Sequence, residues 1–118
     1  MANTGSRSTR GKMAAAAYIE RLEMKILEMD YKTAYGTIPI IAIQGDDLVR
    51  VRVKTQAIDG PHYRAPTLST IRRYNQQIDE YITVIGVPKL AGLNRRFDDI
   101  SIRIIAEDRA LLRHYRGI

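Results

Sequence analysis

The first part of the chain carries the apolar spacing of one amphipathic helix. Ala15, Ile19, Leu22 and Ile26 recur at intervals of three and four residues, so they share one side of a helix. The residues around them are mostly Ala, Glu, Lys and Met, which favour helix formation. This pattern predicts a helix over residues 11–28.

Three short runs with the character of β-strands follow this helix. Residues 31–35 predict a weak strand, and 37–44 predict an apolar, β-branched strand that leads into a hairpin turn. Pro39 cannot donate to a strand ladder, so we expect a bulge or a divergence of the strands there. In residues 48–55 valines alternate with cations, which must face the other side of the strand. Those cations are Arg50, Arg52 and Lys54.

A second helix and two more strands complete the pattern. The stretch 56–66 contains a Gly-Pro pair and a second proline, which predicts a loop. Thr67 is a typical N-cap for a helix over 67–86, which a glycine and a proline end. Residues 96–106 and 110–115 predict two final strands. This order of elements predicts an α/β fold in which helices flank a central mixed sheet.

Composition limits the class of protein. The chain has 118 residues, 45% of them apolar and none of them Cys, which suits one folded domain without disulfides or a thiolate metal site. We expect this domain to span 11–118, and the polar residues 1–10 to form a flexible basic arm. The sequence carries neither a long apolar run nor a signal-peptide pattern, so we expect a cytoplasmic protein with no membrane partner.

Basic residues outnumber acidic ones and are unevenly distributed. There are 19 Lys and Arg against 13 Asp and Glu, which gives a formal net charge of +6. Six cations lie between residues 48 and 75, where Asp59 is the single acid. The asymmetry predicts a basic face that binds DNA or structured nucleic acid, although an ordinary solvated surface would carry the same charges. The candidate binding residues are Arg50, Arg52, Lys54, Arg64, Arg72 and Arg73.

The loop before the second helix combines aromatic and basic side chains. His62, Tyr63 and Arg64 are suited to stacking on unpaired or distorted bases. A surface loop that one aromatic side chain anchors to the core is the simpler interpretation.

Acidic and histidine residues give weaker signals for a metal site. Adjacent residues in a strand point to opposite faces, so Asp98 and Asp99 do not share one metal ion. We expect Asp98 to pair with an arginine instead. His62 and His114 lie far apart in a chain without Cys, which argues against zinc.

Four short segments occur in the order and at the spacing of one known family. They are 18–21 (YIER), 35–42 (YGTIPIIA), 48–55 (LVRVRVKT) and 96–98 (RFD). Together they resemble the YraN family, small bacterial proteins with an endonuclease-like fold that are related to archaeal Holliday-junction resolvases. The resemblance covers residues 11–118 and implies a restriction-endonuclease-like sandwich.

The resemblance also implies a metal site, from which this chain departs. Such nucleases hold Mg²⁺ with acidic residues of the first helix and of two strands, beside a lysine. In this chain the acidic positions fall on Lys12, Thr37, Pro39 and Arg52, and only the lysine, Lys54, is retained. Mg²⁺ needs carboxylate oxygens. The departures therefore predict a domain without Mg²⁺ or another cofactor, in which Lys54 helps to bind nucleic acid rather than to cleave it.

Two other functions remain open at this point. One is an active endonuclease whose carboxylates have moved, for instance to Glu20 or Asp47. The other is a non-catalytic protein-interaction or oligomeric scaffold, such as a homodimer, that keeps the fold without binding nucleic acid.

Overall fold

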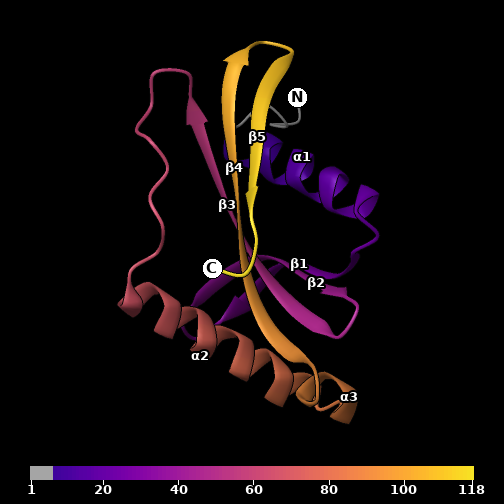
Figure 1. Cartoon of the computed structure of the whole chain (residues 1–118). Coiled ribbons are helices and arrows are strands. Elements are labelled where there is room, and N and C mark those ends of the chain that lie inside the picture. The colour runs from indigo at the N-terminus through magenta and orange to yellow at the C-terminus, as the bar shows by residue number, and fades with distance from the viewer. Residues whose placement is uncertain (1–6) are drawn as a thin grey trace.

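The computed structural model describes residues 7–118 as a five-stranded sheet with three helices (Figure 1). Within these residues, no helix is long and apolar enough to cross a membrane. The elements in chain order are α1 (Arg7–Arg21), β1 (Lys25–Thr33), β2 (Gly36–Gln44), β3 (Asp47–Ala57), α2 (Leu68–Ile85), α3 (Pro88–Ala91), β4 (Asn94–Ala106) and β5 (Arg109–Tyr115).

The five strands pair in sequence order, from β1 at one edge of the sheet to β5 at the other. β3 and β4 run parallel, and every other neighbouring pair is antiparallel. A parallel pair needs a crossover connection, which here contains α2 and α3. The predicted α/β fold with a central mixed sheet is therefore confirmed, and it is compatible with a restriction-endonuclease-like sandwich.

α1 covers one face of the sheet. Its buried residues Ala15 and Ile19 belong to the same apolar cluster as Val51 of β3. The helix lies so close to β3 that a Cβ atom at Gly11 would meet Thr55 Oγ1 at 1.8 Å. A residue without a side chain is therefore needed at this contact.

α2 and α3 cover part of the other face (Figure 1). Ile78 and Tyr81 of α2 cluster with Ile41 of β2 and Leu48 of β3. The cations of β3 also point to this face, as the alternation of the strand predicts. The chain segment 58–67, which connects β3 to α2, runs beside the end of β3 (Figure 1).

The predicted end of the first helix is wrong. α1 ends at Arg21 rather than at residue 28, and Glu23 adopts a left-handed φ of 61°, which stops the helix. Ile26, the last apolar residue of the predicted helical spacing, belongs to β1. Ile26 packs on the α1 side of the sheet and Leu27 on the α2 side, so both faces of this strand carry apolar residues. The strand therefore lacks the alternation of apolar and polar residues that marks a half-buried strand, and it continues the helical spacing by coincidence.

Two smaller expectations for the N-terminal part also need correction. The weak strand expected over 31–35 is the end of β1, which stops at Thr33 before a turn at residues 34–35. Residues 7–10 of the expected basic arm form the first part of α1. Residues 1–6 of that arm lie outside the described residues.

β2 and β3 diverge at Pro39, as predicted. Their pairing ends where Ile40 lies opposite Val51, and the described residues 36–39 have no ladder partner on β3. The strand also rotates here, because Ile38 packs on the α2 side and Ile40 packs on the α1 side. In a regular strand these two side chains would share a face. The divergence leaves the second half of β3 without β2 as a neighbour.

The second half of the chain follows the sequence prediction closely. Thr67 caps α2 by accepting a hydrogen bond from the Thr70 N–H, and Gly86 ends the helix with a φ of 68°. The strands expected over 96–106 and 110–115 are confirmed as β4 and β5. The loop expected between α2 and β4 contains the short helix α3.

Candidate nucleic-acid interface

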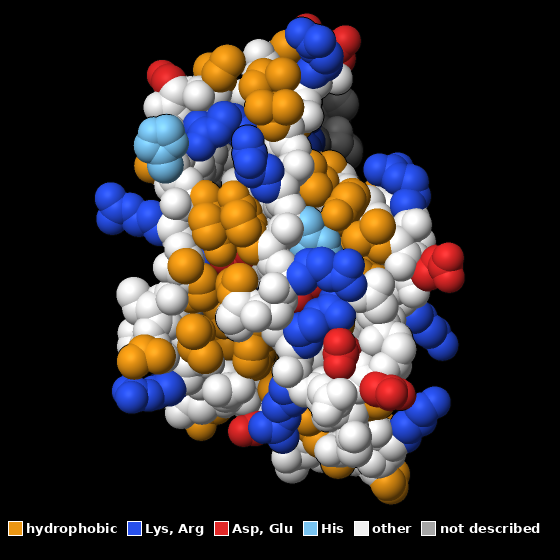
Figure 2. Space-filling view, in the orientation of Figure 1, with side chains coloured by type: hydrophobic (Ala, Val, Ile, Leu, Met, Phe, Trp, Pro, Cys, Tyr) orange, Lys and Arg blue, Asp and Glu red, His pale blue; other side chains and the backbone are white. Residues whose placement is uncertain are grey.

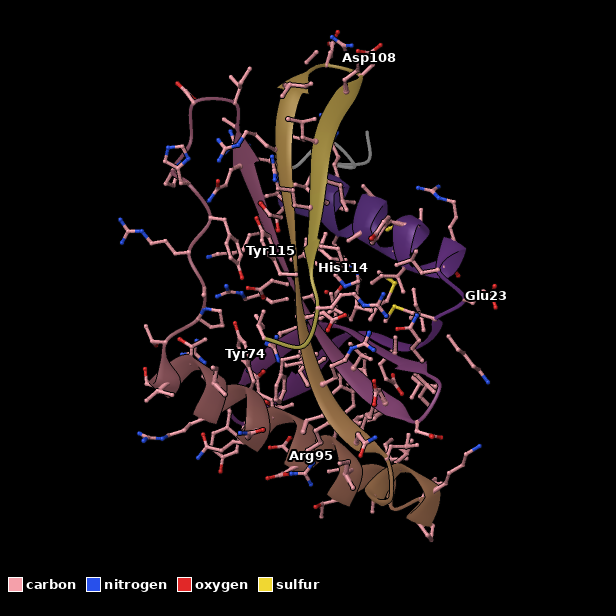
Figure 3. The ribbon with its side chains drawn as sticks, viewed as in Figure 1. Glu23, Tyr74, Arg95, Asp108, His114 and Tyr115 are labelled. Carbon is pink, nitrogen blue, oxygen red and sulfur yellow. The ribbon has the colours of Figure 1, made fainter. Side chains whose placement is uncertain are left out.

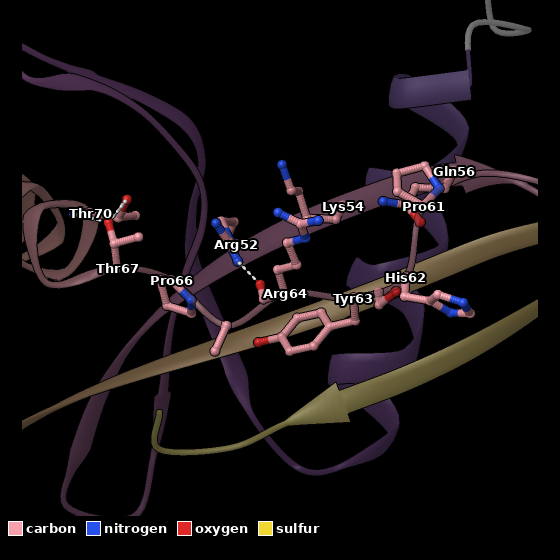
Figure 4. Close-up of a pocket in the computed structure, with 12 residues that line it drawn as sticks. Arg52, Lys54, Gln56, Pro61, His62, Tyr63, Arg64, Pro66, Thr67 and Thr70 are labelled. Atoms are coloured by element: carbon pink, nitrogen blue, oxygen red, sulfur yellow. Dashed lines mark hydrogen bonds between the residues drawn. The ribbon is translucent and has the colours of Figure 1, made fainter.

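The divergence of β2 and β3 opens a groove beside α2. One cavity of about 380 Å³ lies between β2, β3 and α2, and a second of about 450 Å³ lies between β3 and the segment 58–67 (Figure 4). Arg52 and Lys54 line both cavities, so we name the two together the basic cleft. Other lining residues are Thr37, Arg50, Arg73 and Tyr74 in the first cavity and His62, Arg64, Thr67 and Ser101 in the second.

The partly buried Arg52 forms an ion pair with the buried Asp99 at the base of the cleft. Its Nε and Nη2 donate to the two carboxylate oxygens of Asp99 at 2.8 and 2.6 Å, a forked geometry. The Tyr63 hydroxyl donates to the same carboxylate at 2.6 Å, and Arg52 Nη2 donates to the Arg64 carbonyl at 3.4 Å (Figure 4). Burial lowers the pKa of Arg52, but the hydrogen bonds and charge of Asp99 outweigh burial and raise it. Arg52 therefore anchors the segment 58–67 to the sheet.

Arg50 is buried in the wall of the cleft and is 4% exposed. Its Nε donates to Gln77 Oε1 at 2.8 Å, and its guanidinium lies 3.8 Å from the centroid of the Tyr74 ring, a cation–π contact. Burial lowers the pKa of Arg50 to about 10, so the side chain stays protonated at neutral pH. The structure thus places Arg50 behind Tyr74, where it contributes charge to the cleft without facing solvent.

Three of the six candidate binding residues are accessible in the cleft. Lys54, Arg64 and Arg73 are exposed, line the cleft and form no ion pair with an Asp or Glu of residues 7–118. Arg72 is exposed on α2 and lines neither cavity. Among the described residues that line the cleft, none is Asp or Glu. The face seen in Figure 2 carries many Lys and Arg side chains, with hydrophobic side chains between them.

The positions that the resemblance assigns to a metal site do not all meet. Thr37, Arg52 and Lys54 line the same cavity of the cleft. Pro39 is partly buried at the divergence of the strands. Lys12 belongs to α1, where it forms an ion pair with Asp30 of β1.

The expected pairing of Asp98 with an arginine is confirmed. Arg96 donates to both carboxylate oxygens at 3.0 Å, His114 Nε2 lies 2.7 Å from Oδ2, and the Gly117 N–H donates to Oδ1. Burial alone would raise the pKa of Asp98, but the hydrogen bonds from His114 and Arg96 outweigh it and hold the pKa at about 2. Asp99 points to the cleft side, so the two adjacent acids do face opposite sides of the sheet.

The acids named for a relocated metal site are dispersed. Glu20 is exposed on α1, and Asp47 accepts a hydrogen bond from Arg96 Nη1 at 3.0 Å. Across residues 7–118, no three His, Asp or Glu side chains lie together in a way that could hold a metal ion.

β5 contributes side chains to this region that the sequence pattern did not single out. Tyr115 stacks on Tyr63 with ring centroids 3.9 Å apart and planes 8° apart. Figure 3 shows Tyr115 and His114 as neighbours on β5 that point to opposite sides. Arg113 is exposed and lies next to Ser101 of β4. The alternation of β5 is visible in the sequence, but its position beside the cleft follows only from strand pairing.

Similarity to known sequences places the chain in a family. A family model described as "Uncharacterised protein family UPF0102" matches residues 11–102. The chain belongs to this UPF0102 family. Membership agrees with the resemblance to the YraN proteins that the sequence segments indicated.

Individual UPF0102 proteins match over most of their length. The UPF0102 protein of Geobacter sulfurreducens is 34% identical over 109 residues, which cover 89% of this chain and 81% of the relative. That of Syntrophus aciditrophicus is 33% identical over 98 residues, which cover 82% and 76%. An Arthrobacter relative is 40% identical over 86 residues, which cover 73% and 58%. None of these names states an activity.

Proposed function

We propose that this UPF0102 protein binds DNA or structured nucleic acid in the basic cleft and does not cleave it by metal-dependent hydrolysis. One observation carries the proposal: Lys54, Arg64 and Arg73 converge on a cleft whose described lining contains no carboxylate. Such a cleft attracts a polyanion, because each cation can neutralise a phosphate and release its counterions.

The other side chains of the cleft suit phosphate as well. Guanidinium groups bind phosphate oxygens in a forked geometry, and an ammonium group binds them as a point charge. Thr67 and Thr70 also line the cleft, at the N-terminus of α2, where the helix dipole favours negative charge. Contacts of these kinds position a nucleic-acid backbone without reading its sequence.

The donor set does not fit the Mg²⁺ that related nucleases hold. The positions that the resemblance assigns to metal ligands present a hydroxyl at Thr37, a proline ring at Pro39 and a guanidinium at Arg52. The nearby carboxylate of Asp99 is fully buried and already accepts hydrogen bonds from Arg52 and Tyr63. Since Mg²⁺ needs carboxylate oxygens to replace its water, this donor set is unsuited to holding Mg²⁺.

Fluorescence anisotropy with labelled oligonucleotides tests the binding. The variant Lys54→Ala/Arg64→Ala/Arg73→Ala should weaken binding by roughly ten-fold or more at low salt, because about three phosphate contacts are lost. The matched control is Arg21→Ala/Lys25→Ala/Lys89→Ala, which removes three exposed cations that line neither cavity. This control should bind nearly as tightly as the unmodified protein.

The scaffold and the active endonuclease predict different results for binding and cleavage by the same purified protein. Absence of binding at low salt would overturn the proposal in favour of a scaffold. Robust cleavage of plasmid, junction or single-stranded DNA with Mg²⁺ or Mn²⁺ would overturn its second part in favour of relocated carboxylates. The expected result is binding without cleavage.

A further inference from the structure

The sheet face beside the cleft continues across β4 onto β5. Strand pairing places Lys54, Ser101 and Arg113 in one row across β3, β4 and β5. Two strand spacings, roughly 10 Å in all, therefore separate the Cα atoms that carry the two cations, with a hydroxyl between them. The next row consists of Arg52, Asp99 and Tyr115. The cations of the cleft thus have a further cation and an aromatic ring beside them.

A third cavity lies on this part of the sheet. It has a volume of about 270 Å³, and it shares His62, Tyr63 and Ser101 with the larger cavity of the basic cleft. Its other side is formed by β5, which contributes the exposed side chain of Leu111. The residues that line it include His62, Tyr63, Ser101, Leu111, Arg113 and Tyr115.

The aromatic wall of this cavity is fixed in place. Tyr63 stacks on Tyr115, and its hydroxyl donates to the buried Asp99 at 2.6 Å. Burial and this hydrogen bond raise the pKa of Tyr63, so the hydroxyl remains a donor at neutral pH. Tyr63 and Tyr115 cover one face of each other's ring, which leaves the outer ring surfaces to a ligand. Aromatic side chains next to cations form the surface on which unpaired bases stack in single-strand binding proteins.

Arg103 holds the chain segment that carries Tyr63. Its guanidinium donates to four backbone carbonyls of residues 57–61, at 2.7 to 3.1 Å, and to Gln56 Oε1 at 3.0 Å. These bonds shape the loop before any ligand arrives. A site that is ordered in advance loses less entropy when a nucleotide binds.

We infer that this third cavity accepts an unpaired base, so that the site takes single-stranded nucleic acid in preference to continuous duplex. The inference rests on the proposed function, because the phosphates of the same strand would lie in the basic cleft. The base would lie against Tyr63, Tyr115 and Leu111. In a duplex the bases are stacked inside the helix and cannot enter such a cavity, whereas a flexible single strand presents them.

Three oligonucleotide probes test this inference with the unmodified protein. They are a short labelled DNA strand, the same strand with several abasic residues, and the strand paired with its complement. The intact strand should bind about five-fold or more tightly than the abasic strand, because one base–aromatic stack is lost. It should also bind more tightly than the duplex. Binding of an RNA strand of the same sequence shows whether the 2′-hydroxyl of the sugar changes the affinity.

A pair of variants adds an independent readout. Tyr115→Ala should weaken binding of the intact strand about five-fold or more and leave binding of the abasic strand unchanged. Tyr115→Phe keeps the ring and should bind as the unmodified protein does. Quenching of a 2-aminopurine base in the strand should accompany binding to the unmodified protein and be reduced with Tyr115→Ala.

The outcomes separate this inference from the proposed function. Equal binding of intact and abasic strands, or tighter binding of the duplex, would overturn the inference and leave the basic cleft as a phosphate-binding site. Absence of binding by all probes would overturn both. If Tyr115→Ala fails to fold, the comparison of intact and abasic strands still decides the matter.

Discussion

Asp98 and Asp99 are adjacent on β4, both essentially buried, yet they belong to two different environments. On the α1 side, Asp98 accepts hydrogen bonds from Arg96 and from the Gly117 N–H and lies 2.7 Å from His114 Nε2. On the other side, Asp99 bonds Arg52 and Tyr63 beneath the basic cleft.

The difference lies in what surrounds each acid. The two side chains that contact Asp98 have further partners of their own. Arg96 also donates to Asp47, and the other ring nitrogen of His114 is hydrogen-bonded to the Tyr18 hydroxyl. Around Asp99, cations remain in excess, because Lys54 and Arg73 have no carboxylate partner among the described residues. The first network stabilises the fold, whereas the second leaves positive charge available to a ligand.

The largest effect is expected from Asp98→Asn. This change removes one of the two carboxylates that pair with the partly buried Arg96, the other being Asp47, and it also removes the carboxylate that His114 contacts. The expected loss is about 3 kcal/mol of the free energy of unfolding, measured in urea. The matched control is Asp79→Asn, because Asp79 pairs with Arg95 in an exposed ion pair. The control should lose at most about 1 kcal/mol. Equal losses in the two variants would contradict a structural role for the Asp98 network.

Asp99→Asn should have a smaller effect on stability and an additional one on binding. Arg52 faces the cleft and keeps Tyr63 and the Arg64 carbonyl nearby, so the expected loss is about 2 kcal/mol. The charge released from Arg52 should tighten nucleic-acid binding several-fold, whereas folded Asp98→Asn should bind as the unmodified protein does. Weaker binding of Asp99→Asn would break the proposed contrast between the two acids.

Acid sensitivity tests the Asp98 network at a still smaller scale. The pKa of Asp98 is lowered to about 2 in the folded protein, so its contribution is present above the unfolded pKa near 4 and is lost as the pH falls towards 2. A difference of nearly two pKa units corresponds to about 2 kcal/mol. Urea unfolding at pH 5, 4, 3 and 2 should therefore be less pH-dependent in Asp98→Asn. An unchanged profile would contradict the assignment.

The sequence predicted the elements that have local signals and failed where tertiary contacts decide. The N-cap Thr67 and the interruption at Pro39 are local, and both predictions are confirmed. No Gly or Pro marks the end of α1 in the sequence, because the residue that adopts the left-handed φ there is Glu23. Without that signal, the apolar spacing extends the predicted helix into a strand that is packed on both faces.

The composition of the site was only partly predictable for the same reason. The alternation in β3 correctly placed Arg50, Arg52 and Lys54 on one face. Which of them is neutralised depends on the register with β4, since Arg52 lies opposite Asp99. That register cannot be derived from either strand alone. The same holds for the register of β5 with β4, which places Tyr115 opposite Asp99 and so beside the cleft.

The salt dependence of binding tests the central claim most directly. With three or four phosphate contacts, the slope of log affinity against log salt concentration should be about −2 to −4 for the unmodified protein. Lys54→Ala/Arg64→Ala/Arg73→Ala should flatten that slope by about two units. Arg21→Ala/Lys25→Ala/Lys89→Ala should leave it unchanged. Equal slopes for the cleft variant and the unmodified protein would contradict the assignment of the basic cleft as the nucleic-acid-binding site.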